Sequence, residues 1–310
     1  MEKCQYLSVA GAGQKGSMYS GGICALQKHI NILGIEYNDW KKQLKGVSGT
    51  SAGCFLCLQV LLGFGVNEII QMVYHLCDVR QIMPCPNVGL LLESYGLENG
   101  RAFKNIVSHI LSKSGLKETT TLGDLKNLLG KDVIFTATDL NTLSVFEMSN
   151  DKTPDMKVCD AIFISCCIPL LYTPVEYNGK LLTDGCLVCN QPMFFPADKT
   201  LFWLAKEPLG KTTVVNSFSS YVTSIINLPI HNQLPSNISF LKENNCSYVI
   251  FYGTEEIGEL SSFDLKIDEQ NITTMLRCGY YTILDVIFNN KVTQTVSNIL
   301  QIFISVINET

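Results

Sequence analysis

One serine of this sequence lies in a setting typical of an enzymatic nucleophile. Ser51 is the centre of Gly-Thr-Ser-Ala-Gly, with Gly49 and Gly53 two residues away on either side. Glycine tolerates positive φ angles and close backbone approach, so the pair permits a turn that larger residues would block. A short strand-like stretch precedes the motif and an apolar, helix-like stretch follows it, as in turns that present a serine hydroxyl at a helix N-terminus. The motif alone is weak, because roughly one chain in ten of this length contains it by chance.

A glycine-rich segment near the N-terminus supplies backbone donors for a developing negative charge. The sequence GAGQKG ends a strand-like stretch and directly precedes a helical pattern. Neighbouring N–H groups at a helix N-terminus favour an anion, which is what the oxyanion of acyl transfer requires. The residues of this segment are Gly11, Ala12, Gly13, Gln14, Lys15 and Gly16.

The same Gly-x-Gly-x-x-Gly spacing is also typical of dinucleotide binding. That function requires an acidic residue about 20 residues further on, at the end of a second strand. Glu36 lies near this distance, but in the loop-like segment GIEYNDW rather than at a strand end. A purely structural glycine turn is the other alternative.

Asp184 is a better candidate than any of the four histidines for the base that would activate Ser51. It follows an apolar strand-like stretch and precedes Gly185, which allows close backbone approach. Burial in an apolar site would raise the pKa of Asp184 far enough for it to act as a base. The alternative interpretation is that Asp184 is only a turn residue in a hairpin. The four histidines are less suitable: His29, His75 and His109 fall in helical patterns, and His231 falls in NLPIHNQLPSN, which we interpret as a polar loop.

Strand-like and helix-like stretches alternate along the chain, which predicts a mostly parallel sheet in a three-layer α/β/α sandwich. Strands are expected at 5–11, 44–49, 132–140, 143–149, 200–205 and 246–253, with a hairpin over 170–185. Helices are expected at about 17–32, 66–77, 100–113, 122–129, 157–165, 272–289 and 291–307.

The composition limits the classes of function. Of the 310 residues, 46% are hydrophobic and 16% charged, and the net charge of −5 argues against nucleic acid as a partner. No stretch approaches the ~18 uninterrupted apolar residues that a membrane span needs. The N-terminal sequence has no basic segment followed by a long apolar run, so we expect a cytoplasmic protein that is not secreted.

The thirteen cysteines are expected to be reduced thiols. Two pairs, Cys54 with Cys57 and Cys186 with Cys189, have the C-x-x-C spacing that zinc sites and redox pairs use. Both pairs lie among apolar residues, which favours small buried side chains instead. We therefore expect no metal and no organic cofactor.

Three longer segments add to the short motifs. They are YGLENGRAFKNIV (95–107), TDLNTLSVFEM (138–148) and SCCIPLLYTPVEYNGKLLTDGCLVCNQP (165–192). Together with the order Gly-x-Gly-x-x-Gly, Gly-x-Ser-x-Gly and Asp-Gly, they resemble the patatin-like phospholipases, lipid acyl hydrolases with a Ser-Asp dyad. The resemblance covers roughly residues 5–195, as a catalytic domain that residues 196–310 complete with further strands and the C-terminal helices.

The resemblance implies that Ser51 is the nucleophile and Asp184 the general base. The segment from Gly11 to Gly16 would be the oxyanion loop, assisted by the backbone N–H of Ala52. The chain departs from the family pattern at two positions. Ala12 replaces a frequent glycine, which requires a negative φ there. Cys186 replaces the usual glycine or alanine after Asp-Gly, which implies altered packing.

The expected function is hydrolysis of lipid acyl esters, of the phospholipase or lysophospholipase type, through an acyl-enzyme. Alternatives are an acyltransferase with the same dyad and a catalytically silent lipid-binding protein. The expected partner is a lipid or phospholipid ester. The C-terminal stretch has apolar residues at helical spacing, which favours packing in the core. The alternative is peripheral contact with a bilayer through Ile302, Ile304 and Val306, which lie off the main apolar face.

Overall fold

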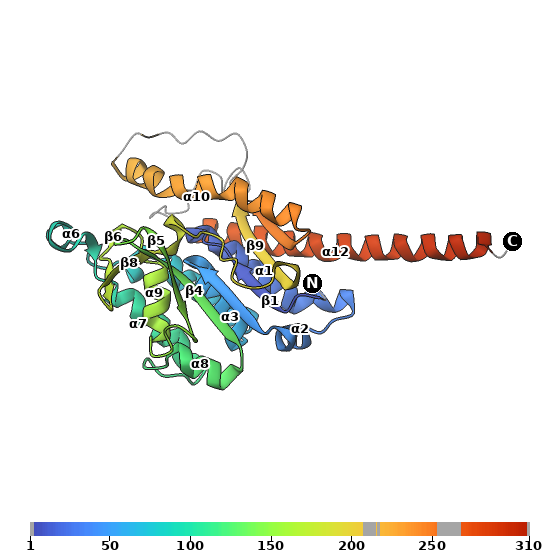
Figure 1. The fold of residues 1–310 in the computed structure, drawn as a ribbon, viewed down its shortest axis with the longest axis horizontal. Coiled ribbons are helices and arrows are strands. Elements are labelled where there is room, and N and C mark those ends of the chain that lie inside the picture. Colours follow the sequence, from blue (N-terminus) through green and yellow to red (C-terminus); the bar gives the residue numbers. More distant parts are fainter. Residues whose placement is uncertain (1–2, 207–214, 216–217, 253–267, 309–310) are drawn as a thin grey trace.

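The computed structural model describes the backbone of residues 3–206, 215, 218–252 and 268–308. Within these ranges the side chains of residues 218, 219, 223 and 290–308 lie outside the description. Strands and helices alternate along the chain, and the helices surround a central sheet (Figure 1). The predicted three-layer α/β/α architecture is confirmed.

The sheet is mostly parallel. Within the described residues it contains eight strands, in the order β10-β9-β1-β2-β4-β8-β7, with β5 paired to β4. The strands from β10 to β4 run parallel to their neighbours, whereas β5, β7 and β8 form antiparallel pairs. The strands are β1 Tyr6–Val9, β2 Gly46–Thr50, β4 Asp132–Asp139, β5 Ser144–Ser149, β7 Val175–Tyr177, β8 Lys180–Asp184, β9 Thr200–Lys206 and β10 Ser247–Tyr252. Two short strands, β3 Gly96–Glu98 and β6 Leu170–Tyr172, pair separately.

Eleven α-helices are described within the ranges given above. They are α1 Ser17–His29, α2 Tyr37–Gln43, α3 Ala52–Leu62, α4 Val66–Cys77, α5 Val79–Ile82, α6 Val88–Ser94, α7 Arg101–Lys113, α8 Leu122–Leu129, α9 Val158–Ser165, α10 Phe218–Glu243 and α12 Glu269–Asn308. None of the described helices is both long and apolar enough to cross a membrane.

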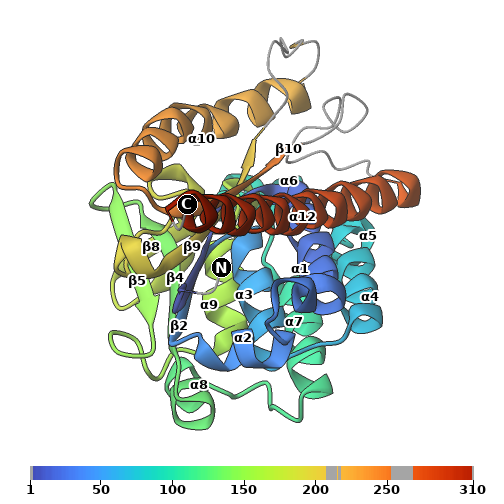
Figure 2. The ribbon, with the colours of Figure 1, turned by 90° about the vertical axis from the view of Figure 1, so that its right-hand side faces the viewer.

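Strand β9 shows how both faces of the sheet are covered. Successive side chains of a strand point to opposite faces. Leu201 and Trp203 join the main core, whereas Phe202 and Leu204 pack with Leu241 of α10 in a second cluster. Helix α12 covers α1 on the side of the main core (Figure 2).

The strand register brings the ends of β2 and β8 to the same level. Thr50 lies opposite Thr136 in β4, and the next residue of β4, Ala137, lies opposite Asp184. Ser51 follows Thr50 directly, so Ser51 and Asp184 meet across the end of β4.

Two local predictions are wrong. The segment around His231, interpreted as a polar loop, lies within the 26-residue helix α10, which contains Pro229 and Pro235. Leu234, Ile238 and Leu241 recur at helical spacing and pack against β9, so tertiary packing outweighs the unfavourable local composition. The two predicted C-terminal helices are one continuous helix, α12, and the side chains of Ile302, Ile304 and Val306 lie outside the described residues.

Candidate active site

Ser51 lies in a tight turn between β2 and α3. Its backbone has φ 51° and ψ −122°, a conformation that non-glycine residues rarely adopt and that costs about 1–3 kcal/mol. The Ser51 N–H donates to the Ser165 hydroxyl at 2.9 Å, which helps to hold the turn. A Cβ atom on Gly53 would lie 2.4 Å from the Val9 carbonyl oxygen, and one on Gly49 would lie 2.8 Å from the backbone nitrogen of Cys54. The turn therefore requires glycine on both sides of the serine.

The structure brings Ser51 and Asp184 into direct contact. The Ser51 hydroxyl donates a hydrogen bond to Asp184 Oδ2 at 2.9 Å, although the two residues are 133 positions apart in the sequence. The Cys186 N–H donates to Asp184 Oδ1 at 2.8 Å, and this bond fixes the orientation of the carboxylate. Both residues are buried.

The surroundings of Asp184 make it a stronger base than an ordinary carboxylate. Burial raises the pKa of Asp184 from 3.8 to about 6, against the lowering effect of the hydrogen bonds from Cys186 and Ser51. A base with a pKa near 6 is ionised at neutral pH and still accepts a proton readily from an attacking hydroxyl.

The glycine-rich loop after β1 lies beside Ser51. Residues Gly13–Gly16 form a 3-10 turn that continues into α1, and Ala12 has φ −149°, so a side chain is tolerated there. A Cβ atom on Gly16 would lie 2.6 Å from the Cβ atom of Ala52, which shows how closely the loop approaches the start of α3.

Two N–H groups of the loop already have protein acceptors. Gly11 donates to the Asn190 carbonyl at 3.0 Å, and Lys15 donates to the Ala12 carbonyl at 3.1 Å. The first N–H groups of a helical turn have no acceptor within it, so Gly13 and Gln14 are better placed as donors to a bound anion.

Cys186, where the family pattern has a smaller residue, packs closely against the glycine-rich loop. A Cβ atom on Gly11 would lie 2.2 Å from Cys186 Sγ, so the thiol fills the space beside Gly11. Gly185 is also restricted, since its Cβ atom would lie 2.4 Å from Thr136 Oγ1. The Asp-Gly turn thus fits closely against both the glycine-rich loop and β4.

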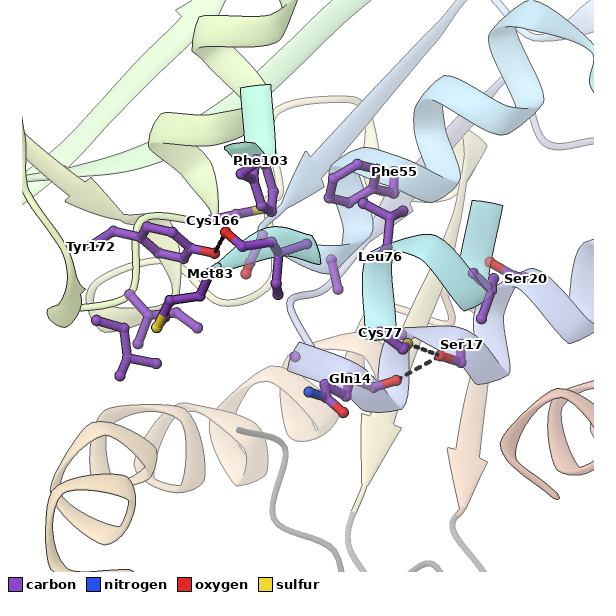
Figure 3. A pocket seen from close by; sticks show the side chains of 18 of the residues that line it. Gln14, Ser17, Ser20, Phe55, Leu76, Cys77, Met83, Phe103, Cys166 and Tyr172 are labelled. Carbon is purple, nitrogen blue, oxygen red and sulfur yellow. Dashed lines mark hydrogen bonds between the residues drawn. The ribbon is translucent and has the colours of Figure 1, made fainter. Parts of the chain in front are cut away.

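An apolar cavity of about 880 Å³, its open mouth included, extends from Ser51. Figure 3 shows Phe55, Phe103 and Tyr172 around it and Ser17 and Ser20 among the few polar side chains. Ser20 donates to Gln59, and Ser17 donates to the Gln14 carbonyl. A cavity of this composition suits a hydrocarbon chain. The apolar lining is completed by Val73, Leu76, Ile82, Met83, Ile168 and Leu171.

Three of the four cysteines in the two C-x-x-C pairs are buried, and Cys189 is half-buried. Cys54 Sγ contacts the Ser165 hydroxyl, and Cys57 Sγ contacts the Ser48 carbonyl. Burial raises the pKa of both thiols, which keeps them protonated. The described part of the chain contains no group of three or more His, Cys, Asp or Glu residues arranged to hold a metal ion.

All four histidines lie in the described part of the chain, and none of them lines the cavity. His29 contacts the Tyr280 hydroxyl at 2.5 Å, and His75 contacts the Gln81 side chain at 2.9 Å. His109 and His231 lie on the exposed sides of α7 and α10.

One residue of the site gave no signal in the sequence. Gln233 of α10 donates through Nε2 to the carbonyl oxygens of Cys186 (3.0 Å) and Leu187 (3.3 Å) and accepts through Oε1 from the Asn190 N–H (2.8 Å). It therefore holds both ends of the turn that follows Asp184. Since the Asn190 carbonyl accepts from Gly11, the same turn connects Gln233 to the glycine-rich loop.

Two viral proteins are similar to most of the chain. Over 280 residues the chain is 22% identical to the uncharacterized protein R571 of Acanthamoeba polyphaga mimivirus, covering 85% of this chain and 88% of the relative. It is 24% identical over 284 residues to the probable lipid hydrolase 463L of Invertebrate iridescent virus 6, covering 86% of this chain and 89% of that relative.

The fold also matches a solved structure. The crystal structure of VipD from Legionella pneumophila superposes with a TM-score of 0.58 at 16% identity, covering 93% of this chain and 67% of VipD. At this identity the likeness concerns the fold alone. The family profile of patatin-like phospholipases matches residues 7–197, more than half of the chain and including both Ser51 and Asp184. The chain therefore belongs to the patatin-like phospholipase family.

Proposed function

We propose that the protein is a serine hydrolase that cleaves acyl esters of lipids with a Ser51–Asp184 dyad. The observation that carries the proposal is the 2.9 Å hydrogen bond from the Ser51 hydroxyl to a buried carboxylate with a raised pKa, at one end of an apolar cavity. Membership of a phospholipase family and the likeness to a probable lipid hydrolase support lipid esters as the substrate class.

In the first half of the reaction, Ser51 Oγ attacks the ester carbonyl carbon while its proton passes to Asp184 Oδ2. The carbonyl oxygen becomes an oxyanion, which the N–H groups of Gly13, Gln14 and Ala52 would stabilise. When the intermediate collapses, Asp184 returns the proton to the departing alcohol, and the acyl group remains on Ser51.

In the second half, Asp184 takes a proton from water as the water oxygen attacks the acyl-enzyme. Collapse of this second intermediate releases the fatty acid, and Asp184 returns the proton to Ser51 Oγ. If a lysolipid or another alcohol replaces water, the same acyl-enzyme gives acyl transfer.

The test is incubation of the protein with a mixed lipid extract, with lost esters, new fatty acids and transfer products identified by mass. Ser51→Ala is expected to abolish turnover and labelling by a fluorophosphonate probe, because only the nucleophile is removed. Ser144→Ala, which changes an exposed serine of β5, is the matched control and should retain both. Labelling that persists in Ser51→Ala would refute the nucleophile assignment. A wild-type protein that depletes no ester and forms no transfer product would refute the proposed activity.

A further inference from the structure

We propose that the protein docks on zwitterionic lipid membranes through an apolar surface beside the cavity. This surface, called here the rim, consists of Val88, Leu92 and Tyr95 of the α6 segment and of Leu170 in β6. The inference rests on the proposed function, because it assigns the neighbouring cavity to a lipid acyl chain.

The rim exposes large apolar side chains on a short helix and on the residue that ends it. Val88 and Leu92 are four residues apart, which places them on one face of α6, and Tyr95 directly follows the helix. Their side chains are 65%, 79% and 64% exposed. Leu170, which is 44% exposed, lies opposite Gly96 in the pairing of β3 with β6, and so beside Tyr95. A cluster of this kind marks a surface that contacts an apolar partner.

The rim adjoins residues that line the cavity. Ile82 and Met83, a few residues before α6, line the cavity, and so do Ile168 and Leu171 on either side of Leu170. The Tyr172 hydroxyl donates to the Ile82 carbonyl at 3.2 Å, so the two halves of the wall are joined (Figure 3). An acyl chain leaving a membrane at the rim would therefore pass along apolar side chains towards Ser51.

The position of the rim suits contact with a flat surface. Helix α6 lies at one end of the molecule, opposite the end that carries the C-terminus (Figure 1). A helix at an extremity can reach an interface without obstruction by the rest of the fold.

The charge of the rim indicates the type of lipid. Residues 82–97 contain one charged residue, Glu93, and residues 166–172 contain none. The nearest basic residue before this range, Arg80, is paired with Asp78, so the rim attracts anionic head groups only weakly. The net charge of −5 opposes binding to an anionic surface. The partner that fits is a neutral or zwitterionic surface, bound through its apolar region.

The backbone supports an active role for these exposed side chains. Tyr95 and Leu170 both have φ 67°, in the left-handed region that bulky residues rarely adopt. The fold thus holds two large apolar side chains in solvent in an unfavourable backbone conformation. Such strain tends to be kept where it serves binding or catalysis.

The experiment compares wild-type protein with the variant Val88→Asp/Leu92→Asp in flotation with phosphatidylcholine vesicles. The matched control is Leu128→Asp in α8, since Leu128 is 62% exposed and α8 lies apart from α6 in Figures 1 and 2. The rim variant should partition into vesicles about tenfold more weakly or worse, the factor that corresponds to removing one or more large apolar side chains from an apolar phase. Vesicle binding by the control should stay within about twofold of the wild type, because a single exposed apolar side chain outside the rim does not form a docking surface.

A second measurement separates docking from catalysis. Hydrolysis of p-nitrophenyl butyrate, a short ester free in water, should be unchanged in the rim variant, while hydrolysis of vesicle phosphatidylcholine falls with vesicle binding. Leu92→Ser serves as a milder variant if the charged one fails to fold, as judged by its melting temperature.

The outcomes distinguish the two proposals. Equal vesicle binding by the wild type and the rim variant would overturn the docking surface. So would a wild-type dimer that the rim substitutions convert to a monomer, because the rim would then cover a second copy. Loss of vesicle binding in the rim variant, combined with a wild type that hydrolyses neither ester, would support docking and refute the proposed function.

Discussion

Replacement of the proposed base by its amide should make the protein inactive and more stable. Asp184 is 2% exposed, and its pKa is about 6 instead of 3.8. One pKa unit corresponds to about 1.4 kcal/mol, so the ionised carboxylate lowers the free energy of unfolding by about 3 kcal/mol at pH 8. Asp184→Asn removes this charge in a side chain of the same shape. Its oxygen can still accept from the Cys186 N–H, so we expect a gain of about 2–3 kcal/mol at pH 8.

The pH dependence identifies the cause of this gain. Below pH 3.8 the carboxyl group is protonated in the folded and the unfolded chain, and the two proteins should have similar stability. As the pH rises from 3.8 to about 6, the unfolded chain ionises first and the wild type loses stability relative to Asp184→Asn. Above pH 6 the difference between the two proteins should be constant.

The assay is chemical denaturation of both proteins between pH 4 and pH 8, with kcat/KM for ester hydrolysis over the same range. Wild-type activity should rise with a single ionisation near pH 6, as Asp184 becomes deprotonated, and then level off. The matched control is Asp151→Asn, an exposed carboxylate that should leave both curves unchanged. A stability difference that does not vary with pH, or an Asp184→Asn protein that is less stable at pH 8, would refute the reasoning.

Three further substitutions test other parts of the site. Gln233→Leu should lower kcat by about tenfold or more with little change in KM, because it releases the turn that orients Asp184. Gln233→Glu keeps the acceptor for the Asn190 N–H and should lose less activity. Equal rates in the wild type and both variants would contradict this role. Gly11→Ala should reduce activity strongly, because the new Cβ atom clashes with Cys186 Sγ. Adding Cys186→Gly to this variant should restore part of the activity. If no activity returns, the clash with Cys186 is not the cause of the loss. His231→Ala should keep its rate within about twofold, since His231 is exposed and does not line the cavity; an inactive variant would indicate a histidine base instead.

The features that the sequence predicted are set by local chemistry. The turn around Ser51 requires glycine at 49 and 53, and a hairpin with Asn178 and Gly179 at its tip has left-handed φ angles of 50° and 74°. Such requirements restrict residue types over a few positions, so a single sequence reveals them. The position of Asp184 at a strand end could be predicted for the same reason, because an Asp-Gly pair after an apolar strand is also a pattern of a few neighbouring residues.

The features that the sequence did not predict depend on contacts between distant segments. Helix α10 has two internal prolines and a polar composition, and its apolar face becomes apparent only against β9. Gln233 acts through backbone groups 43 to 47 residues away, which any side-chain amide of the right length could reach. Helix α6 has seven residues and too little periodicity to be distinguished from a loop.

The wide separation of Ser51 and Asp184 in the chain has a consequence for how the protein folds. The two side chains meet only after β2, β4 and β8 have taken their places. The neighbouring strand β1 pairs Tyr6 with Gly46 of β2, 40 positions away, and with Thr200 of β9, 194 positions away. Contacts of such long range form slowly, because a large loop must close before any of them is made. Helices α1 and α3 can form earlier, from short-range contacts, without producing a reactive serine. During refolding, reactivity towards a fluorophosphonate should therefore return after the circular dichroism of the helices, and the nucleophile becomes a reporter of the last stage of assembly.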